Sequence, residues 1–181
     1  RATQGLYAPG STFKTVTATG ALDSGLYTPS TTIDAFGNCI YPTQFPIFVK
    51  LCNAGTESFG MISLSEAMTY SVNTVFAQVG LKLGGTRLTD YMQRFGFYAP
   101  PTLDYPSDEM VTSGRYQNGR RMGPLQQLDV AREAIGQERL SVTPLQMADV
   151  AATIANGGER MRLSLVDRAI APGGSTAYTA H

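Results

Sequence analysis

Apolar residues recur at helical spacing near the start of the chain, in residues 11–24. Phe13, Val16 and Ala21 lie on one face of a helix drawn over this stretch, and Gly25 follows its last turn. An apolar stripe of this period is typical of a helix that packs against a core, and glycine commonly follows a helix end. The pattern predicts a first helix from Ser11 to about Ser24.

Two further helices are predicted in the middle of the chain. Ser63 and Glu66 open the stretch "SLSEAMTY" (63–70) with the spacing of a capping box, in which two side chains satisfy each other's backbone N–H groups. The stretch "TVFAQVGLKL" (74–83) has helical periodicity and is followed by two glycines. A short turn separates the two predicted helices.

Residues 86–96, "TRLTDYMQRFG", predict another helix, with Thr86 as its N-cap and Gly96 as its terminator. Two other regions lack such a period. Residues 28–62 mix Pro, Gly, Asn and aromatic residues, which predicts loops and short strands. Residues 97–128 are rich in Pro, Gly and Tyr, and predict a long irregular excursion on the surface.

The most complete set of helix signals lies in "TPLQMADVAATIANGG", residues 143–158. Thr143 is the expected N-cap, Pro144 occupies the first helical position, and Gln146 has the spacing that completes a capping box. Asn156 and Gly157 supply a left-handed stop. These signals predict a helix that begins at Pro144 and ends near Asn156.

The pattern changes in "RMRLSLVDRAIA" (160–171), where apolar Met161, Leu163 and Leu165 alternate with polar residues. An alternation of period two predicts a strand. A helix-rich part followed by one strand predicts an α+β class. We expect residues 1–181 to form a single domain that is an excerpt from a longer protein.

Composition and charge narrow the classes of function. The chain has 181 residues, of which 43% are hydrophobic and 15% charged, so it is large and apolar enough for an ordered core. Its 14 basic residues balance 14 acidic ones, so no net field favours nucleic acid or an anionic membrane surface. We expect no nucleic-acid partner.

The two cysteines and the single histidine limit the chemistry further. Cys39 and Cys52 lack C-x-x-C spacing and His181 is the only histidine, which argues against a zinc site, and no cofactor is expected. The cysteines either form a disulfide in an oxidising compartment, which we favour, or are two unrelated thiols. A catalytic unit that needs a histidine base has no candidate here, so lysine becomes the candidate base.

Ser11 and Lys14 form an S-x-x-K pattern at the start of the first helix. Side chains three residues apart share one helix face, and both the helix N-terminus and burial would lower the pKa of Lys14. A neutral lysine is a general base for a serine hydroxyl, and the Ser11 backbone N–H points to where an oxyanion can be held. The alternative, an N-cap serine followed by a solvated lysine, is the commoner meaning of this pattern on its own.

The stretch "YSVNTVF" places Ser71 and Asn73 in the turn between two predicted helices. A turn of this kind can present both side chains to one cleft. Ser71 would then relay a proton from the lysine to a leaving group, and Asn73 would hold a substrate amide through its donor and acceptor. The alternative is a plain turn, because Ser and Asn are ordinary turn residues.

Together, S-x-x-K followed by S-x-N resembles the signature of the penicillin-binding proteins, the serine D,D-transpeptidases of bacterial cell-wall synthesis. The flanking stretches "RATQGLYAPGSTFK" (1–14) and "AIGQERLSVTPLQMADVAATIANGG" (134–158) resemble monofunctional class B members, with actinobacterial elongation-type enzymes the most similar. The resemblance implies the transpeptidase fold shared with serine β-lactamases. It implies that this chain is a partial domain, truncated at both ends, containing the helical lobe and the start of the antiparallel sheet.

By this resemblance, Ser11 attacks the penultimate D-alanine carbonyl of a D-Ala-D-Ala stem peptide and expels the terminal D-alanine. Lys14 takes the serine proton, Ser71 passes it to the leaving amine, and Asn73 binds the donor peptide's amide. An amine of a second strand then forms the cross-link, and β-lactams acylate Ser11 in the same pocket. The implied partners are stem peptides, β-lactams and the cell-wall synthesis machinery. The implied location is the extracytoplasmic face of the membrane, with an anchor outside this chain.

The chain departs from the family in one respect, because the third motif, K-T/S-G, is absent from its 181 residues. That motif's strand normally supplies a second oxyanion donor, worth roughly 3 to 4 kcal/mol of transition-state stabilisation. We therefore expect the segment alone to acylate poorly.

Three other functions stay open. A class D-like β-lactamase shares S-T-F-K, although "FGN" (36–38) here precedes the second motif instead of following it. The E-x-x-L-N pattern that positions a deacylating water in the other main serine β-lactamase class is absent. A β-lactam sensor domain shares S-x-x-K, and a non-catalytic cell-wall scaffold would keep the fold without turnover.

Overall fold

The computed structural model describes residues 1–42, 50–124 and 129–179, and His181 lies outside these ranges. The helical elements are η1 (Gly10–Phe13), α1 (Lys14–Asp23), α2 (Leu64–Thr69), α3 (Asn73–Leu83), α4 (Gly85–Arg94), η2 (Ser107–Glu109), α5 (Val130–Glu133) and α6 (Pro144–Ala155). The strands are β1 (Thr32–Ala35), β2 (Cys39–Ile40), β3 (Leu51–Cys52), β4 (Gly60–Ser63), β5 (Gly114–Gln117), β6 (Arg120–Arg121), β7 (Leu140–Ser141), β8 (Arg168–Ile170) and β9 (Thr176–Thr179). This is the α+β content that the sequence predicts.

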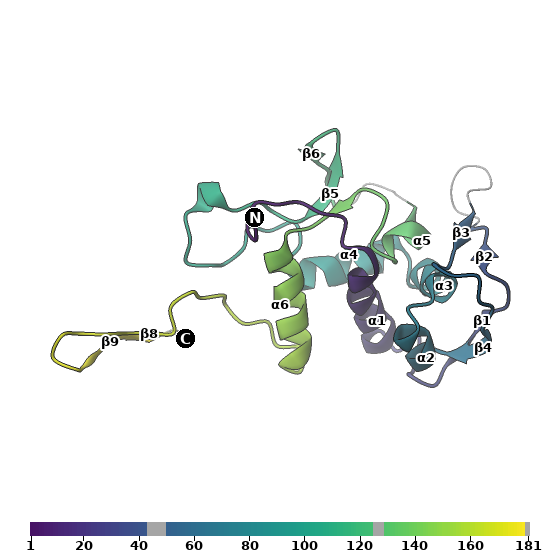
Figure 1. Ribbon diagram of the computed structural model, residues 1–181, viewed down its shortest axis with the longest axis horizontal. Coiled ribbons are helices and arrows are strands. Elements are labelled where there is room, and N and C mark those ends of the chain that lie inside the picture. Colours follow the sequence, from purple (N-terminus) through teal and green to yellow (C-terminus); the bar gives the residue numbers. More distant parts are fainter. Residues whose placement is uncertain (43–49, 125–128, 180–181) are drawn as a thin grey trace.

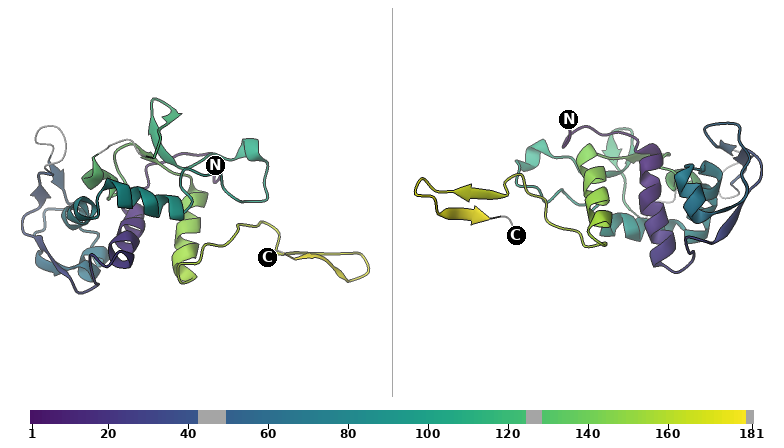
Figure 2. Two further views of the ribbon diagram at one scale, coloured as in Figure 1. Left: turned by 180° about the vertical axis from the view of Figure 1, so that it is seen from behind. Right: turned by 60° about the horizontal axis from the view of Figure 1, so that its bottom comes forward.

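Helix α1 lies in the middle of the molecule, with α2 and α3 on one side and α6 on the other (Figures 1 and 2). Phe13, Val16 and Ala21 are completely buried, which confirms the predicted apolar face. The helix ends at Asp23, and Gly25 has a φ of +71°. Its start differs from the prediction, because the first turn, η1, is a 3₁₀ helix and α-helical geometry begins at Lys14.

Two apolar clusters flank α1. One gathers residues of α3 with residues of the β1–β4 sheet, among them Ile33, Ile62, Val75, Phe76 and Val79. The other joins η1 and α4 to the segments before α6, among them Phe13, Leu88, Met92, Phe97 and Leu140. A polar side chain that points inward from α1 therefore enters an interior from which apolar groups exclude water.

The described strands pair only in small antiparallel sheets. Strand β1 pairs with β4, placing Ile33 opposite Ile62, and β2 pairs with β3, placing Cys39 opposite Cys52. Strand β5 lies between β6 and β7, and β8 pairs with β9. The β8–β9 hairpin extends away from the helices (Figure 1), and all residues of its two strands are exposed.

The helix boundaries are mostly as predicted. The capping box of Ser63 and Glu66 is complete at the start of α2. Helix α6 begins at Pro144, directly after its N-cap Thr143. No helix in the described ranges is both long and apolar enough to cross a membrane.

One predicted cap is wrong, and one predicted capping box is incomplete. Thr86 lies inside α4, which begins at Gly85 after an N-cap glycine, Gly84, with a φ of +81°. The capping box at α6 is only half formed. The Thr143 hydroxyl accepts from the Gln146 backbone N–H at 3.1 Å, but the Gln146 side chain donates to the Phe95 carbonyl at 2.8 Å instead of returning to Thr143.

The strand predicted in residues 160–171 forms only in their last part, at Arg168–Ile170. The alternating residues 160–165 are irregular, and Met161 and Leu165 are exposed. The strand begins later, at Arg168, where a partner is available in β9. Alternation along one segment does not make a strand unless a second segment supplies the ladder of hydrogen bonds.

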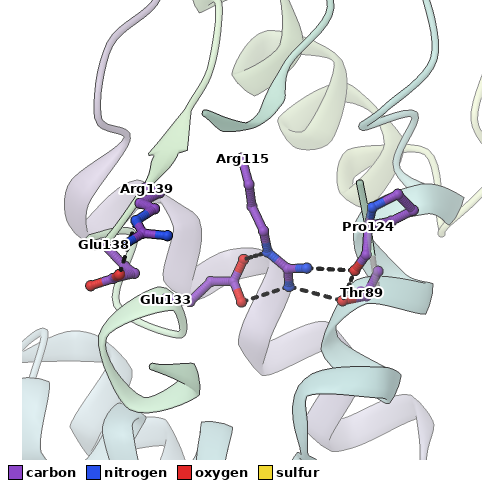
Figure 3. A network of polar contacts seen from close by, with 6 residues as sticks. All are labelled: Thr89, Arg115, Pro124, Glu133, Glu138 and Arg139. Carbon is purple, nitrogen blue, oxygen red and sulfur yellow. Dashed lines mark hydrogen bonds and ion pairs between the residues drawn. The ribbon is translucent and has the colours of Figure 1, made fainter. Parts of the chain in front are cut away.

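The irregular excursion predicted over residues 97–128 is partly wrong, because its second half contains the β5–β6 hairpin and a fully buried arginine, Arg115. The Arg115 guanidinium donates to both carboxylate oxygens of Glu133, which is also fully buried. It further donates to the Thr89 hydroxyl and the Pro124 carbonyl (Figure 3). This network ties β5, α5 and α4 together.

Candidate active site

Ser11 lies in η1, on an exposed turn in front of α1. The preceding residue, Gly10, has a φ of +55°, and its N–H donates to the Gly136 carbonyl at 3.0 Å. No side-chain cap bond is present at the start of η1, so the alternative that Ser11 serves only as an N-cap is wrong. The turn holds the Ser11 hydroxyl at the surface while the helix behind it is buried.

Lys14 is the first residue of α1, and only 1% of it is exposed. Its Nζ donates three hydrogen bonds to the turn between α2 and α3. The acceptors are the Ser71 carbonyl at 2.7 Å, Ser71 Oγ at 3.0 Å and Asn73 Oδ1 at 2.6 Å. The alternative of a solvated lysine is therefore wrong, and the structure brings together Lys14, Ser71 and Asn73.

Burial lowers the pKa of Lys14 to about 8. The cause is desolvation, which disfavours the ammonium more than the three acceptors stabilise it. Lys14 also occupies the first turn of α1, where the helix dipole acts in the same direction. With this pKa about a tenth of the lysine is neutral at pH 7, against well below a thousandth for an exposed lysine.

Ser71 occupies a strained backbone position. It follows the last turn of α2 with a φ of +54°, and the N–H groups of Ser71 and Val72 donate to the carbonyls of Met68 and Ala67. This is the Schellman arrangement, in which the left-handed residue is normally glycine or asparagine. The strain has a local result: both the carbonyl and the hydroxyl of Ser71 face Lys14.

Asn73 begins α3 and has both ends of its amide bonded. Its Oδ1 accepts from Lys14 Nζ, and its Nδ2 donates to the Cys52 carbonyl at 2.9 Å. Cys52 forms a disulfide with Cys39. This confirms the favoured prediction of a disulfide and shows that the alternative of two unrelated thiols is wrong.

No hydrogen bond joins Ser11 Oγ to Lys14 Nζ in the described part of the chain, because all three ammonium protons are directed to the α2–α3 turn. A neutral lysine carries two protons and a lone pair, so one acceptor is released on deprotonation. Ser71 Oγ can then reverse its role and donate to the lysine. The arrangement is suited to moving one proton among Ser11, Lys14 and Ser71.

Two supporting residues were not identified from the sequence. A Cβ on Gly136, whose φ is +74°, would overlap the Gly10 carbonyl, so only glycine allows the loop after α5 to seat the turn that carries Ser11. Asn53 Oδ1 accepts from the Thr74 N–H at 3.0 Å and so caps α3 from a distant segment. Gly136 lies in the stretch quoted for the family resemblance, and its being a glycine was the one sequence signal for its role. No sequence signal marks Asn53.

The described ranges contain no group of three or more His, Cys, Asp or Glu side chains able to hold a metal ion. The chemistry of the site is that of a hydroxyl, an amine and an amide.

Comparison with known proteins agrees with this geometry. Residues 1–180 match the family model of the penicillin-binding protein transpeptidase domain. The peptidoglycan D,D-transpeptidase PbpA of Mycolicibacterium smegmatis is 34% identical over 99% of this chain and 35% of its own length. PbpA of Mycobacterium tuberculosis is 33% identical over 92% of this chain and 32% of its own length. The peptidoglycan D,D-transpeptidase MrdA of Haemophilus influenzae is 32% identical over 88% of this chain and 24% of its own length.

Solved structures give the same family. The imipenem acyl-enzyme of penicillin-binding protein A from M. tuberculosis superposes with a TM-score of 0.81 and 32% identity, covering 99% of this chain and 39% of that one. The D,D-transpeptidase domain of a peptidoglycan glycosyltransferase from Eggerthella lenta superposes with a TM-score of 0.77 and 27% identity. This match covers 100% of this chain and 44% of that one. The chain spans about a quarter to a third of the length of these curated relatives. It belongs to the penicillin-binding protein transpeptidase family.

Proposed function

We propose that the protein is a peptidoglycan D,D-transpeptidase that works through an acyl-serine intermediate and is acylated by β-lactams. The observation that carries the proposal is the burial of Lys14 among Ser71 and Asn73, one helical turn from an exposed serine. Burial of this kind keeps a lysine partly neutral near physiological pH, as a general base requires. Relatives that are named D,D-transpeptidases add support.

In the proposed reaction, Ser11 Oγ attacks the carbonyl carbon of the penultimate D-alanine of a stem peptide. The hydroxyl proton passes to Lys14, and the backbone N–H of Ser11 faces the developing oxyanion. Ser71 Oγ delivers the proton to the nitrogen of the terminal D-alanine as the C–N bond breaks. An amine of a second stem peptide then attacks the acyl-enzyme, which restores Ser11 and forms the cross-link.

Asn73 has a binding role in this proposal, because its amide can contact the donor peptide while its oxygen stays on Lys14. β-Lactams enter the same site, as in the acyl-enzymes of M. tuberculosis penicillin-binding protein A with imipenem and ceftriaxone. The Cys39–Cys52 disulfide fits an oxidising compartment. We place the site on the extracytoplasmic face of the membrane, beside the cell-wall synthesis machinery and held by an anchor outside this chain.

The test is intact-mass spectrometry of the full-length protein with benzylpenicillin, followed by peptide mapping. We expect one adduct, on Ser11, and none in Ser11→Ala. Release of D-alanine from a stem pentapeptide then distinguishes a transpeptidase from a β-lactam sensor, and a long acyl-enzyme lifetime distinguishes it from a β-lactamase. An adduct on any other residue would refute the proposal.

A further inference from the structure

The β2–β3 hairpin, closed by the Cys39–Cys52 disulfide and here called the disulfide hairpin, touches the active site at two points. The Cys52 carbonyl accepts from Asn73 Nδ2, and the Asn53 side chain accepts from the N–H of Thr74. Asn73 and Thr74 are the first two residues of α3, whose own N-cap, Val72, offers no side-chain bond. The disulfide hairpin therefore supplies the cap that the local sequence lacks.

The contact with Cys52 decides which way the Asn73 amide faces. In the observed orientation, its oxygen meets the Lys14 ammonium and its NH₂ meets a carbonyl. A flipped amide would place NH₂ against the ammonium, two donors facing each other, and oxygen against the Cys52 carbonyl, two acceptors facing each other. Both ends disfavour the flip while Cys52 stays in place. If Cys52 moves away, only the contact with Lys14 remains to orient the amide.

The disulfide keeps Cys52 in place together with the neighbouring Leu51, which is buried in the apolar core. Strands β2 and β3 have two residues each, and a two-stranded ribbon of this length is not stable by itself. The described bonds that hold the disulfide hairpin include the pairing of Cys39 with Cys52, the Asn53 N–H donating to the Asn38 carbonyl at 2.9 Å, and Arg132 donating to the Lys50 carbonyl at 3.3 Å. The covalent bond fixes the residue whose carbonyl holds Asn73.

We propose that the disulfide hairpin is a positioning element of the active site, in which Cys39–Cys52 and Asn53 hold Asn73 so that its amide oxygen stays on Lys14. The proposal rests on the proposed function for its consequence in catalysis. If the disulfide hairpin no longer holds Asn73, the Lys14 ammonium loses Asn73 Oδ1 as an acceptor. The pKa of Lys14 then falls further. The same loss also frees the Asn73 side chain, which lowers the rate of acylation at every pH.

The experiment measures the acylation rate of the full-length protein by a fluorescent penicillin between pH 6 and 10. Three preparations are compared: wild type, Cys39→Ser/Cys52→Ser, and wild type reduced with a phosphine. For the last two we expect the plateau rate to fall about tenfold to a hundredfold and the midpoint to move to lower pH. Reoxidation of the reduced protein should restore both values.

A second pair of variants tests the same element without touching the sulfurs. Asn53→Ala should lower the plateau and move the midpoint, whereas Asn53→Asp keeps an oxygen for the Thr74 N–H and should recover most of the plateau rate. Asn156→Ala, which removes a remote asparagine bond at the end of α6, is the matched control and should change neither value. Near-UV circular dichroism confirms that each preparation is folded.

The outcomes separate the two proposals. A wild type that is not acylated at all refutes the proposed function. The positioning role is then read from the Lys14 pKa by NMR of lysine labelled at Cε and Nζ, which should fall on reduction. If wild type is acylated and the rate falls without a shift of the midpoint, the disulfide hairpin only stabilises the fold, and the positioning proposal is wrong. Unchanged plateau and midpoint in all variants overturn it equally.

Discussion

The two sides of the candidate site are held in different ways. The nucleophile side, around Ser11, is exposed and is seated by backbone contact, with Gly10 against Gly136. The base side, around Lys14, is buried and is held by polar side chains and carbonyls of the α2–α3 turn. Shape thus sets the position of the hydroxyl, while burial and hydrogen bonding set the proton affinity of the amine. The following experiments test this division.

Removal of the amine on the base side should have the largest effect. Lys14→Met keeps the length of the side chain but removes the base, so acylation by penicillin should slow by about 10³-fold or more. The same change at Lys82, which is exposed on α3, is the control and should leave the rate within about twofold of wild type. A similar loss in both variants would contradict the special role of the buried lysine.

Loss of the buried ion pair between Arg115 and Glu133 should have the next largest effect. Arg115→Met leaves the Glu133 carboxylate buried without its partner, which should reduce the free energy of unfolding by about 3 to 5 kcal/mol. Arg162 pairs with Asp104 on the surface, so Arg162→Met should cost less than about 1 kcal/mol. Urea denaturation of the full-length protein measures both, and equal losses would show that burial is not the deciding factor.

Gly136→Ala tests whether shape positions Ser11. The added methyl group must displace the Gly10 carbonyl, so acylation should slow by about 10²-fold, as expected when a reacting group moves by about an ångström. Gly119 has the same φ of +74° with open space around it. Gly119→Ala therefore carries the same backbone strain without the overlap, and its acylation rate should stay near that of wild type.

The pH dependence of the acylation rate tests the base side of the site. Because the pKa of Lys14 is about 8, the rate of acylation should rise about tenfold between pH 7 and pH 9 and then level off. The lysine is protonated less readily in the folded than in the unfolded chain. Relative to Lys14→Met, the free energy of unfolding should therefore increase from about pH 8 toward the ordinary lysine pKa. A flat rate profile over this range would rule out Lys14 as the base.

The smallest effect concerns the strain at Ser71. Ser71→Ala and Ser71→Gly both remove the hydroxyl and should both slow acylation, but glycine accepts the left-handed backbone. Ser71→Gly should therefore be more stable than Ser71→Ala by about 1 kcal/mol. Glu138 also has a φ of +66°, and Glu138→Gly should likewise be more stable than Glu138→Ala by about 1 kcal/mol. Thermal unfolding and the acylation assay together test this.

The sequence predicted the site where its residues are local to one another. The spacing of Ser11 and Lys14 and the short turn carrying Ser71 and Asn73 are enough to propose their roles, and the structure brings the last three together. It did not predict Gly136 or Asn53, because each acts through a contact with a distant segment. Those contacts depend on the packing of the whole lobe, which no local pattern records.

The same distinction explains the successes and errors in the fold. Helices with complete end signals, such as α6 after Thr143, begin where predicted because a helix satisfies its own hydrogen bonds. Within the strand predicted over 160–171, only Arg168–Ile170 forms a strand, because a strand needs a partner and this is the segment that has one. Arg115 was assigned to a surface excursion because its buried partner, Glu133, lies 18 residues away.

The left-handed backbone at Ser71 has a consequence for drug resistance. Selection by a β-lactam favours substitutions that weaken acylation yet preserve cross-linking. At this position, the residues that suit the backbone best, glycine and asparagine, both lack the hydroxyl that the proposed reaction uses. Under the proposed function, an escape variant at this turn would lose cross-linking along with its susceptibility, so adaptation must proceed through other residues.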